Sequence, residues 1–298
     1  MTRLITALDI ADPARARVFA TSLDPALTRL KIGNEAFTAG GPALVEDLQR
    51  LGFDVFLDLK YHDIPNTVAA AVTRAAALGV WMVNVHAGGG RRMLEAAREA
   101  LARHGRAPSE AATDTSGTSV DARGGTRLVG VTVLTSLERE DLVELGLHVD
   151  PVAQVERLAT LVRDAGLDGV VCSPRELATI RALAPSSFLT VTPGIRPATD
   201  DVGAIPSTGA PDASPPRAPA ARDDQRRVST AREAILAGAD HLVVGRPVTR
   251  APDPLVALRT LGEEIDAALA ERGARAVGTA ASTDTDTDTD TDEGEATR

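Results

Sequence analysis

The sequence lacks several features that would assign it to a specialised class. It has one cysteine, Cys172, which excludes an intramolecular disulfide and fits a reducing compartment. No apolar run approaches the roughly 18 residues of a membrane helix, and no charged-then-apolar leader opens the chain. The 32 basic residues are outnumbered by 42 acidic ones, which argues against a nucleic-acid surface. We therefore expect a cytoplasmic protein with neither nucleic-acid nor membrane partners.

The chain does contain short apolar runs that alternate with helix-like segments rich in Ala, Leu and Arg. Their near-continuous apolar character is typical of parallel strands that are covered on both faces. The runs are Leu4–Leu8, Leu27–Ile32, Val55–Leu59, Trp81–His86, Leu128–Leu134, Gly169–Cys172, Phe188–Thr192 and His241–Val244. Eight β-then-α units predict an α/β fold, a (β/α)8 TIM barrel, with an open doubly wound sheet as the alternative.

Three segments lack the apolar content that would offset the entropy cost of ordering them. Residues 106–126 are rich in Ser, Thr, Gly and Asp, residues 198–221 in Pro and Ala, and the C-terminus carries a Thr-Asp repeat. We expect one barrel domain, residues 1–273, with two mobile loop insertions at about 106–126 and 198–221. Residues 274–298 are expected to form a disordered Thr/Asp-rich tail.

Polar residues gather where the expected strands end. The run Val55–Leu59 leads into Asp58, Lys60 and Asp63, and residues two apart on a strand share a face, so Asp58 and Lys60 are expected side by side. Other strand ends carry Asp9, Lys31, Thr135, Pro193, Arg196, Gly245 and Arg246. In a barrel these ends meet at the rim that holds active sites. Taken alone, Asp58 and Lys60 also fit a structural salt bridge.

Gly245 and Arg246, after the last expected strand, suit the binding of a phosphate group. A glycine lets the backbone approach an anion closely, and the guanidinium fork of arginine matches phosphate oxygens. Barrel enzymes often bind phosphate with the loops after strands seven and eight. The alternative for Arg246 is an ordinary solvated arginine.

The stretch Asp58-Leu59-Lys60-Tyr61-His62-Asp63-Ile64-Pro65-Asn66-Thr67 resembles the signature of the orotidine 5′-phosphate decarboxylase family. Four further motifs support the resemblance: Leu8-Asp9, Leu30-Lys31-Ile32-Gly33, Val191-Thr192-Pro193-Gly194-Ile195-Arg196 and Val243-Val244-Gly245-Arg246-Pro247. It runs from about Leu4 to Ala257 and is interrupted by the two insertions. The resemblance implies a homodimeric (β/α)8 barrel without metal or organic cofactor. It also implies conversion of orotidine 5′-monophosphate to uridine 5′-monophosphate and carbon dioxide, in pyrimidine (UMP) biosynthesis.

Elementary chemistry points to Lys60 as the centre of such a reaction. Removing a carboxylate from an sp² ring carbon leaves a poorly stabilised carbanion, so the protein must stabilise that charge and deliver a proton. A fixed ammonium suits both tasks, neighbouring carboxylates favour its charged form, and the resemblance makes Lys60 the proton donor to C6. The resemblance also places Asp58 near the substrate carboxylate, a repulsion that would be relieved as carbon dioxide leaves.

The resemblance implies roles for the other strand-end residues. Lys31 is expected between the ribose and the aspartates, and Asp63 is expected to reach into the neighbouring subunit's site. The expected catalytic residues are Lys60, Asp58, Asp63 and Lys31. The expected substrate-binding residues are Asp9, Lys31, Asp58, Ile64, Thr67, Thr135, Pro193, Arg196, Gln225, Gly245 and Arg246. Turn or helix-cap roles are the alternatives for Asp9, Asp63 and Thr135.

Two other functions remain open from the sequence. One is a magnesium-dependent sugar-phosphate decarboxylase or aldolase of the same superfamily, whose members share the pattern Asp-x-Lys-x-x-Asp. Those enzymes place a carboxylate metal ligand where this chain has Lys31, and an ammonium there repels a divalent cation. The other is a phosphate-binding barrel that performs no turnover.

Overall fold

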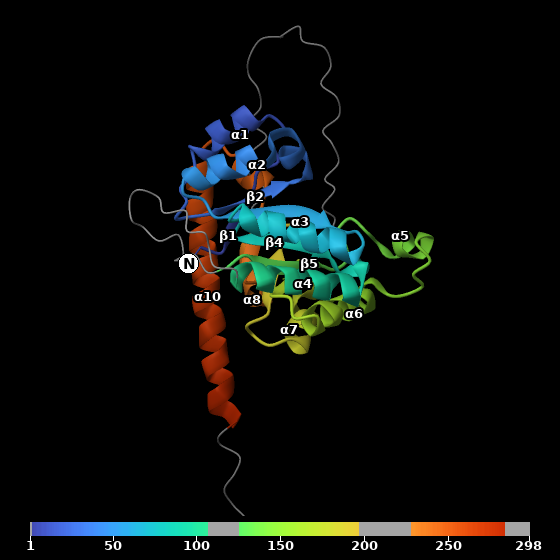
Figure 1. The fold of residues 1–298 in the computed structure, drawn as a ribbon. Helices are drawn as coiled ribbons and strands as arrows, with labels where there is room; N and C mark the ends of the chain where they lie inside the picture. Colours follow the sequence, from blue (N-terminus) through green and yellow to red (C-terminus); the bar gives the residue numbers. More distant parts are fainter. Residues whose placement is uncertain (1, 107–124, 197–227, 284–298) are drawn as a thin grey trace, which may run out of the picture.

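The computed structural model describes residues 2–106, 125–196 and 228–283 (Figure 1). Its eight parallel strands close into a barrel in which each strand pairs with the next and β8 pairs with β1. The strands are β1 (Leu4–Ala7), β2 (Arg29–Gly33), β3 (Val55–Tyr61), β4 (Met82–His86), β5 (Arg127–Val131), β6 (Gly169–Val171), β7 (Leu189–Thr192) and β8 (His241–Val244). The closed barrel confirms the expected fold and excludes the open doubly wound sheet.

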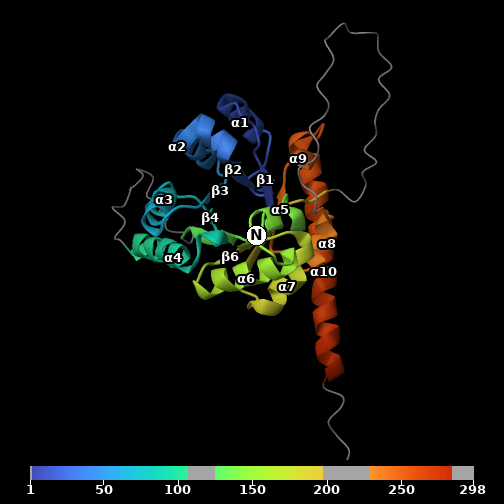
Figure 2. The same cartoon turned by 90° about the vertical axis from the view of Figure 1, so that its right-hand side faces the viewer.

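Helices surround this barrel in a ring, as Figures 1 and 2 show. The helices are α1 (Pro13–Ala20), α2 (Asn34–Arg50), α3 (Pro65–Ala77), α4 (Arg91–Arg106), α5 (Arg139–Glu144), α6 (Pro151–Asp164), α7 (Leu177–Leu183), α8 (Ala231–Leu236), α9 (Arg246–Thr249) and α10 (Pro254–Thr283). Short 3₁₀ turns, η1 (Ala87–Gly89) and η3 (Pro174–Glu176), follow β4 and β6. Among these described helices, none is long and apolar enough to cross a membrane.

Helix α10 extends well beyond the barrel (Figures 1 and 2). It continues to Thr283, so the domain boundary expected at residue 273 falls inside it. An Ala-rich sequence that lacks proline after the first turn accounts for this continuation, because alanine has the highest helix propensity. Residues 284–298, and almost all of the two expected insertions, lie outside the described residues. The division into barrel, insertions and tail stays a prediction.

The apolar core has two parts. One cluster fills the barrel and consists of strand residues together with Trp81, which directly precedes β4: Ile5, Ala7, Phe56, Trp81, Met82, Val129, Val191 and Val243. Alternate residues of the same strands, such as Leu4 and Leu57, belong to the larger cluster between the strands and the helices. The two-residue period of the strands therefore explains why most of them are apolar on both faces.

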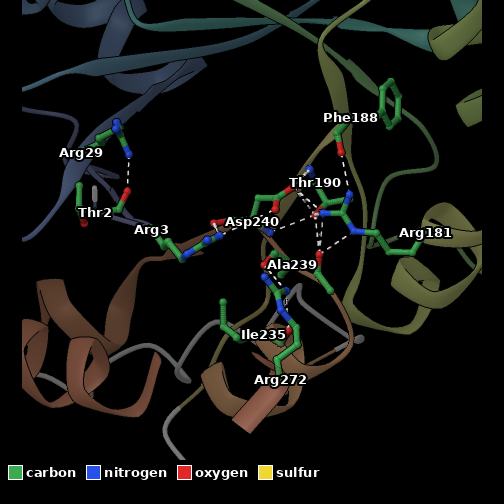
Figure 3. Close-up of polar contacts among 11 residues, drawn as sticks. Thr2, Arg3, Arg29, Arg181, Phe188, Thr190, Ile235, Ala239, Asp240 and Arg272 are labelled. Atoms are coloured by element: carbon green, nitrogen blue, oxygen red, sulfur yellow. Dashed lines mark hydrogen bonds and ion pairs between the residues drawn. The ribbon is translucent and has the colours of Figure 1, made fainter. Parts of the chain in front are cut away.

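A network of ion pairs ties together the amino-terminal ends of β7 and β8 (Figure 3). Asp240 accepts hydrogen bonds from the Arg181 guanidinium and, at 2.9 Å, from the backbone N–H of Thr190. Arg181 also donates to the carbonyl oxygens of Phe188 and Gly238. This network lies at the end of the barrel away from the strand-end residues discussed below, where barrel proteins concentrate stabilising contacts.

Candidate active site

Four charged side chains of alternating sign meet at the carboxyl ends of β1, β2 and β3. Lys31 Nζ lies 3.5 Å from Asp9 Oδ1 and 3.2 Å from Asp58 Oδ2. Lys60 Nζ lies 2.7 Å from Asp58 Oδ1. These three strands are neighbours in the barrel, so residues distant in sequence converge here. We call Asp9, Lys31, Asp58 and Lys60 the charge cluster.

Mutual attraction keeps the buried members of the charge cluster ionised. The side chains of Lys31 and Asp58 are only 12% and 11% exposed. Burial alone would raise the pKa of Asp58, but the charges of Lys31 and Lys60 outweigh burial and lower it. Burial alone would lower the pKa of Lys31, but the carboxylates of Asp58 and Asp9 outweigh burial and raise it. The raised pKa of Lys31 and the lowered pKa of Asp58 therefore both favour the charged forms of these two side chains.

The end of β3 departs from regular strand geometry where it enters the charge cluster. Leu57 pairs with Val83 and Tyr61 pairs with Val85, so four residue steps of β3 face two steps of β4. Within this bulge Lys60 has a φ of 50°, the one positive φ of a non-glycine residue in the described part of the chain. Such conformations are costly and concentrate at functional sites. Asp58 and Lys60 thus lie side by side through a bulge, not through strand alternation alone.

Asn84, on β4, lies beside the bulge and was not selected by the sequence interpretation. It is fully buried. Its Nδ2 donates to Asp58 Oδ1 at 2.6 Å, and its Oδ1 accepts the backbone N–H of Lys60 at 2.8 Å. The sequence did contain one indication of this role: Asn84 is a lone amide inside the apolar strand Met82–His86, and a buried polar side chain needs hydrogen-bond partners.

Other expected substrate-binding residues also lie at carboxyl ends of strands. Pro193 and Arg196 follow β7, where the backbone N–H of Arg196 donates to the carbonyl of Ser229 at 2.9 Å. Gly245 follows β8, and a Cβ added to it would lie 3.8 Å from Asp9 Oδ2. Gly245 therefore borders the charge cluster directly.

Three expected site residues have a less direct relation to the charge cluster. Thr135 follows β5 in a partly buried position, and Arg246 begins α9. Gln225 lies outside the described residues. The roles of all these residues in binding stay predictions.

The segment after β3 faces outward from the barrel. Asp63, Ile64 and Thr67 are exposed, and Asp63 Oδ1 accepts the backbone N–H of Ile64 at 2.6 Å. Ile64 is 68% exposed although it is large and apolar. The segment borders a hollow of about 520 Å³, which His62, Asp63, Ile64, Pro65, Gly88, Gly89 and Arg92 line. Within the described part of the chain, none of the ion pairs of the charge cluster involves Asp63.

The fold and the charge cluster together define a (β/α)8-barrel protein with an acid–base site at the carboxyl ends of its strands. Residues 2–261 match the model of the Orotidine 5′-phosphate decarboxylase / HUMPS family, and the chain belongs to this family. This match confirms the resemblance inferred from the sequence motifs.

Individual relatives agree with the family match. The chain is 52% identical over 264 residues to an orotidine 5′-phosphate decarboxylase of Chromohalobacter salexigens, with 89% of this chain and 96% of that one covered. It is 49% identical over 269 residues to the enzyme of that name from Chromobacterium violaceum, with 90% and 94% covered. The crystal structure of orotidine 5′-phosphate decarboxylase from Lactobacillus acidophilus is 30% identical with a TM-score of 0.69, covering 89% and 99% of the two chains.

Proposed function

We propose that the protein is an orotidine 5′-phosphate decarboxylase, a carboxy-lyase of pyrimidine biosynthesis. It converts orotidine 5′-monophosphate to uridine 5′-monophosphate and carbon dioxide. The observation that carries this proposal is the charge cluster, in which Lys60 Nζ lies 2.7 Å from Asp58 within the family's signature stretch. Family membership and relatives at about half identity support it.

Lys60 performs the central chemical step. As the bond between C6 and the carboxylate breaks, the electron pair stays on C6 and carbon dioxide departs. The ammonium of Lys60 stabilises the developing negative charge and then transfers one proton to C6, which leaves a neutral amine that regains a proton from solvent. The ammonium charge is in place before the reaction, so no reorganisation is needed as negative charge develops on C6. Because that negative charge is larger in the transition state than in the ground state, the ammonium stabilises the transition state more.

Asp58 and Lys31 prepare this step. Asp58 is held ionised, by the lowered pKa described above, so it repels a substrate carboxylate placed beside it and loses that repulsion as carbon dioxide leaves. Lys31, whose pKa is raised, fixes Asp58 from the other side at 3.2 Å and lies next to Asp9. We assign Asp9 and Lys31 to the ribose hydroxyl groups.

The remaining strand ends bind the base and the phosphate. We assign the pyrimidine ring to Thr135 and Pro193, and the phosphate to Arg196, Gly245 and Arg246. An arginine fork and a glycine backbone both match phosphate oxygens. Gln225 joins the phosphate group in this proposal. The reaction as written requires neither a metal nor an organic cofactor.

The active protein is a homodimer in this proposal, with Asp63, Ile64 and Thr67 completing the partner's site. Support comes from the exposure of Ile64, an apolar side chain next to a hollow, at the end of the strand that carries Lys60. We further propose that the enzyme is cytoplasmic and binds no nucleic acid, as its acidic balance and single cysteine indicate.

An ultraviolet assay of orotidine 5′-monophosphate loss tests the proposal. Protein dialysed against EDTA is expected to convert the substrate fully to uridine 5′-monophosphate, at the same rate with or without added magnesium. Activity that appears only with magnesium, on a sugar phosphate, would instead identify the sugar-phosphate enzyme, which no observation favours. Tight binding of uridine 5′-monophosphate without turnover would identify a binding protein.

A further inference from the structure

Asn84 is the contact point between the bulge of β3 and its neighbour β4. The bulge places Lys60 opposite a strand with too few residues to pair regularly, since four steps of β3 face two of β4. The backbone N–H of Lys60 donates to the side chain of Asn84 at 2.8 Å. One side-chain amide therefore takes the place of a strand-pairing carbonyl at the residue with φ of 50°.

The two hydrogen bonds of Asn84 fix the orientation of its amide. A backbone N–H can only donate, so the oxygen of the amide faces Lys60. An ionised carboxylate can only accept, so the NH₂ group faces Asp58, at 2.6 Å. The same Asp58 oxygen also accepts from Lys60 Nζ at 2.7 Å. Asn84, Asp58 and Lys60 thus form a closed ring of contacts that passes through both the backbone and the side chain of Lys60.

We propose that Asn84 is a positioning residue for decarboxylation: its amide locks the left-handed turn at Lys60 and the carboxylate of Asp58 into one unit, so that the Lys60 ammonium stays aimed at the reacting carbon. This inference rests on the proposed function. Asn84 acts through Lys60 and Asp58 and makes no contact with substrate. A fully buried amide is well suited to the task, because no water competes for its two hydrogen bonds.

Two substitutions at this position separate positioning from plain structural support. Asn84→Ala removes both hydrogen bonds and is expected to lower kcat about 100-fold with a much smaller change in KM, since an error near 1 Å in a catalytic group costs that much. Asn84→Asp keeps the shape. At neutral pH its carboxylate would repel Asp58, but once protonated it can donate to Asp58 and accept from Lys60, as the amide does.

The kcat of the Asn84→Asp variant, divided by the wild-type value at each pH, is therefore expected to rise at least tenfold from pH 8 to pH 5.5. The same ratio for Asn84→Ala is expected to stay flat. His62 and His86 lie nearby, with ring centroids 5.5 Å apart, but both are present in every variant and in the wild-type reference. Thr6→Val, which removes the buried Thr6–Thr28 hydrogen bond of 2.9 Å, is the matched control and should change stability without changing the kcat ratio.

The outcomes separate this inference from the proposed function. A wild-type protein inert toward orotidine 5′-monophosphate would overturn the proposed function. Parallel pH ratios for the two variants, or an Asn84→Ala kcat within about threefold of wild type, would overturn the positioning role. A crystal structure of whichever variant folds provides a test that needs no activity: a Lys60 turn that keeps its φ near 50° in Asn84→Ala, or in deprotonated Asn84→Asp, would also overturn it.

Discussion

His241 gives the protein a pH-dependent stability that can be worked out from the structure. It begins β8 at the amino-terminal end of the barrel, and its ring meets the Trp81 ring edge-on with centroids 5.1 Å apart. Burial, followed by the charge of Arg29, lowers the pKa of His241 from 6.5 to about 4. The Arg29 guanidinium lies over the same Trp81 ring at 4.1 Å, so a second positive charge on His241 would be poorly tolerated.

The lowered pKa of His241 determines the direction in which stability changes with pH. Above pH 6.5 both the folded and the unfolded states hold a neutral His241, and its contribution to stability is complete. As the pH falls from 6.5 towards 4, the unfolded state takes up a proton that the folded state refuses, so stability is lost. A shift of this size corresponds to about 3 kcal/mol, of which about 2.5 kcal/mol is lost by pH 4.5.

Urea unfolding of wild type and His241→Gln at pH 7 and pH 4.5 measures this contribution. The amide of the variant does not titrate, so its free energy of unfolding should fall between the two pH values by about 2.5 kcal/mol less than that of wild type. Comparing the falls in the free energy of unfolding between the two pH values, instead of the free energies themselves, removes the direct effect of the substitution on stability. His148→Gln replaces an exposed histidine and is expected to follow wild type. Equal falls in wild type and His241→Gln would refute the reasoning.

Three further predictions concern the active site. Lys60→Ala should bind uridine 5′-monophosphate in a titration yet lose decarboxylation by orders of magnitude in the ultraviolet assay; substantial residual activity would contradict its role as proton donor. A refolded equal mixture of Lys60→Ala and Asp63→Ala chains should recover about a quarter of wild-type activity, because half of randomly paired dimers carry one intact site of two; no recovery would argue against a shared site. Asp58→Asn should lower the free energy of unfolding in urea by about 3–5 kcal/mol at pH 7, because Lys31 and Lys60 lose their buried counter-charge. An unchanged free energy of unfolding would show that the ion pairs of Asp58 with Lys31 and Lys60 do not contribute to stability.

The fold could be predicted from the sequence because the apolar runs are short, continuous and regularly spaced. Each expected strand is present to within three residues at either end. The convergence of Asp9, Lys31 and Asp58 could be predicted for the same reason, since a closed parallel barrel brings the carboxyl ends of its strands to one rim. The apolar pattern of the strands and the topology of the closed barrel favour the same arrangement, so the sequence was sufficient to predict it.

The sequence could not show how the charged groups are held. Strand alternation indicates that Asp58 and Lys60 share a face, but the contact depends on a bulge and a left-handed Lys60, which no local propensity favours. Asn84 was overlooked because its partners lie on a neighbouring strand. Composition alone does not distinguish an Ala-rich tail from a helix, so it could not indicate that α10 runs to Thr283.

Proton nuclear magnetic resonance of the product formed in deuterium oxide tests the central claim most directly. The exchangeable ammonium of Lys60 would carry deuterium, so EDTA-dialysed protein should turn orotidine 5′-monophosphate into uridine 5′-monophosphate with one deuterium at C6 for each carbon dioxide released. Product that carries no deuterium at C6, or no product until a divalent cation is added, would contradict metal-free decarboxylation with protonation of C6 by an exchangeable group such as the Lys60 ammonium.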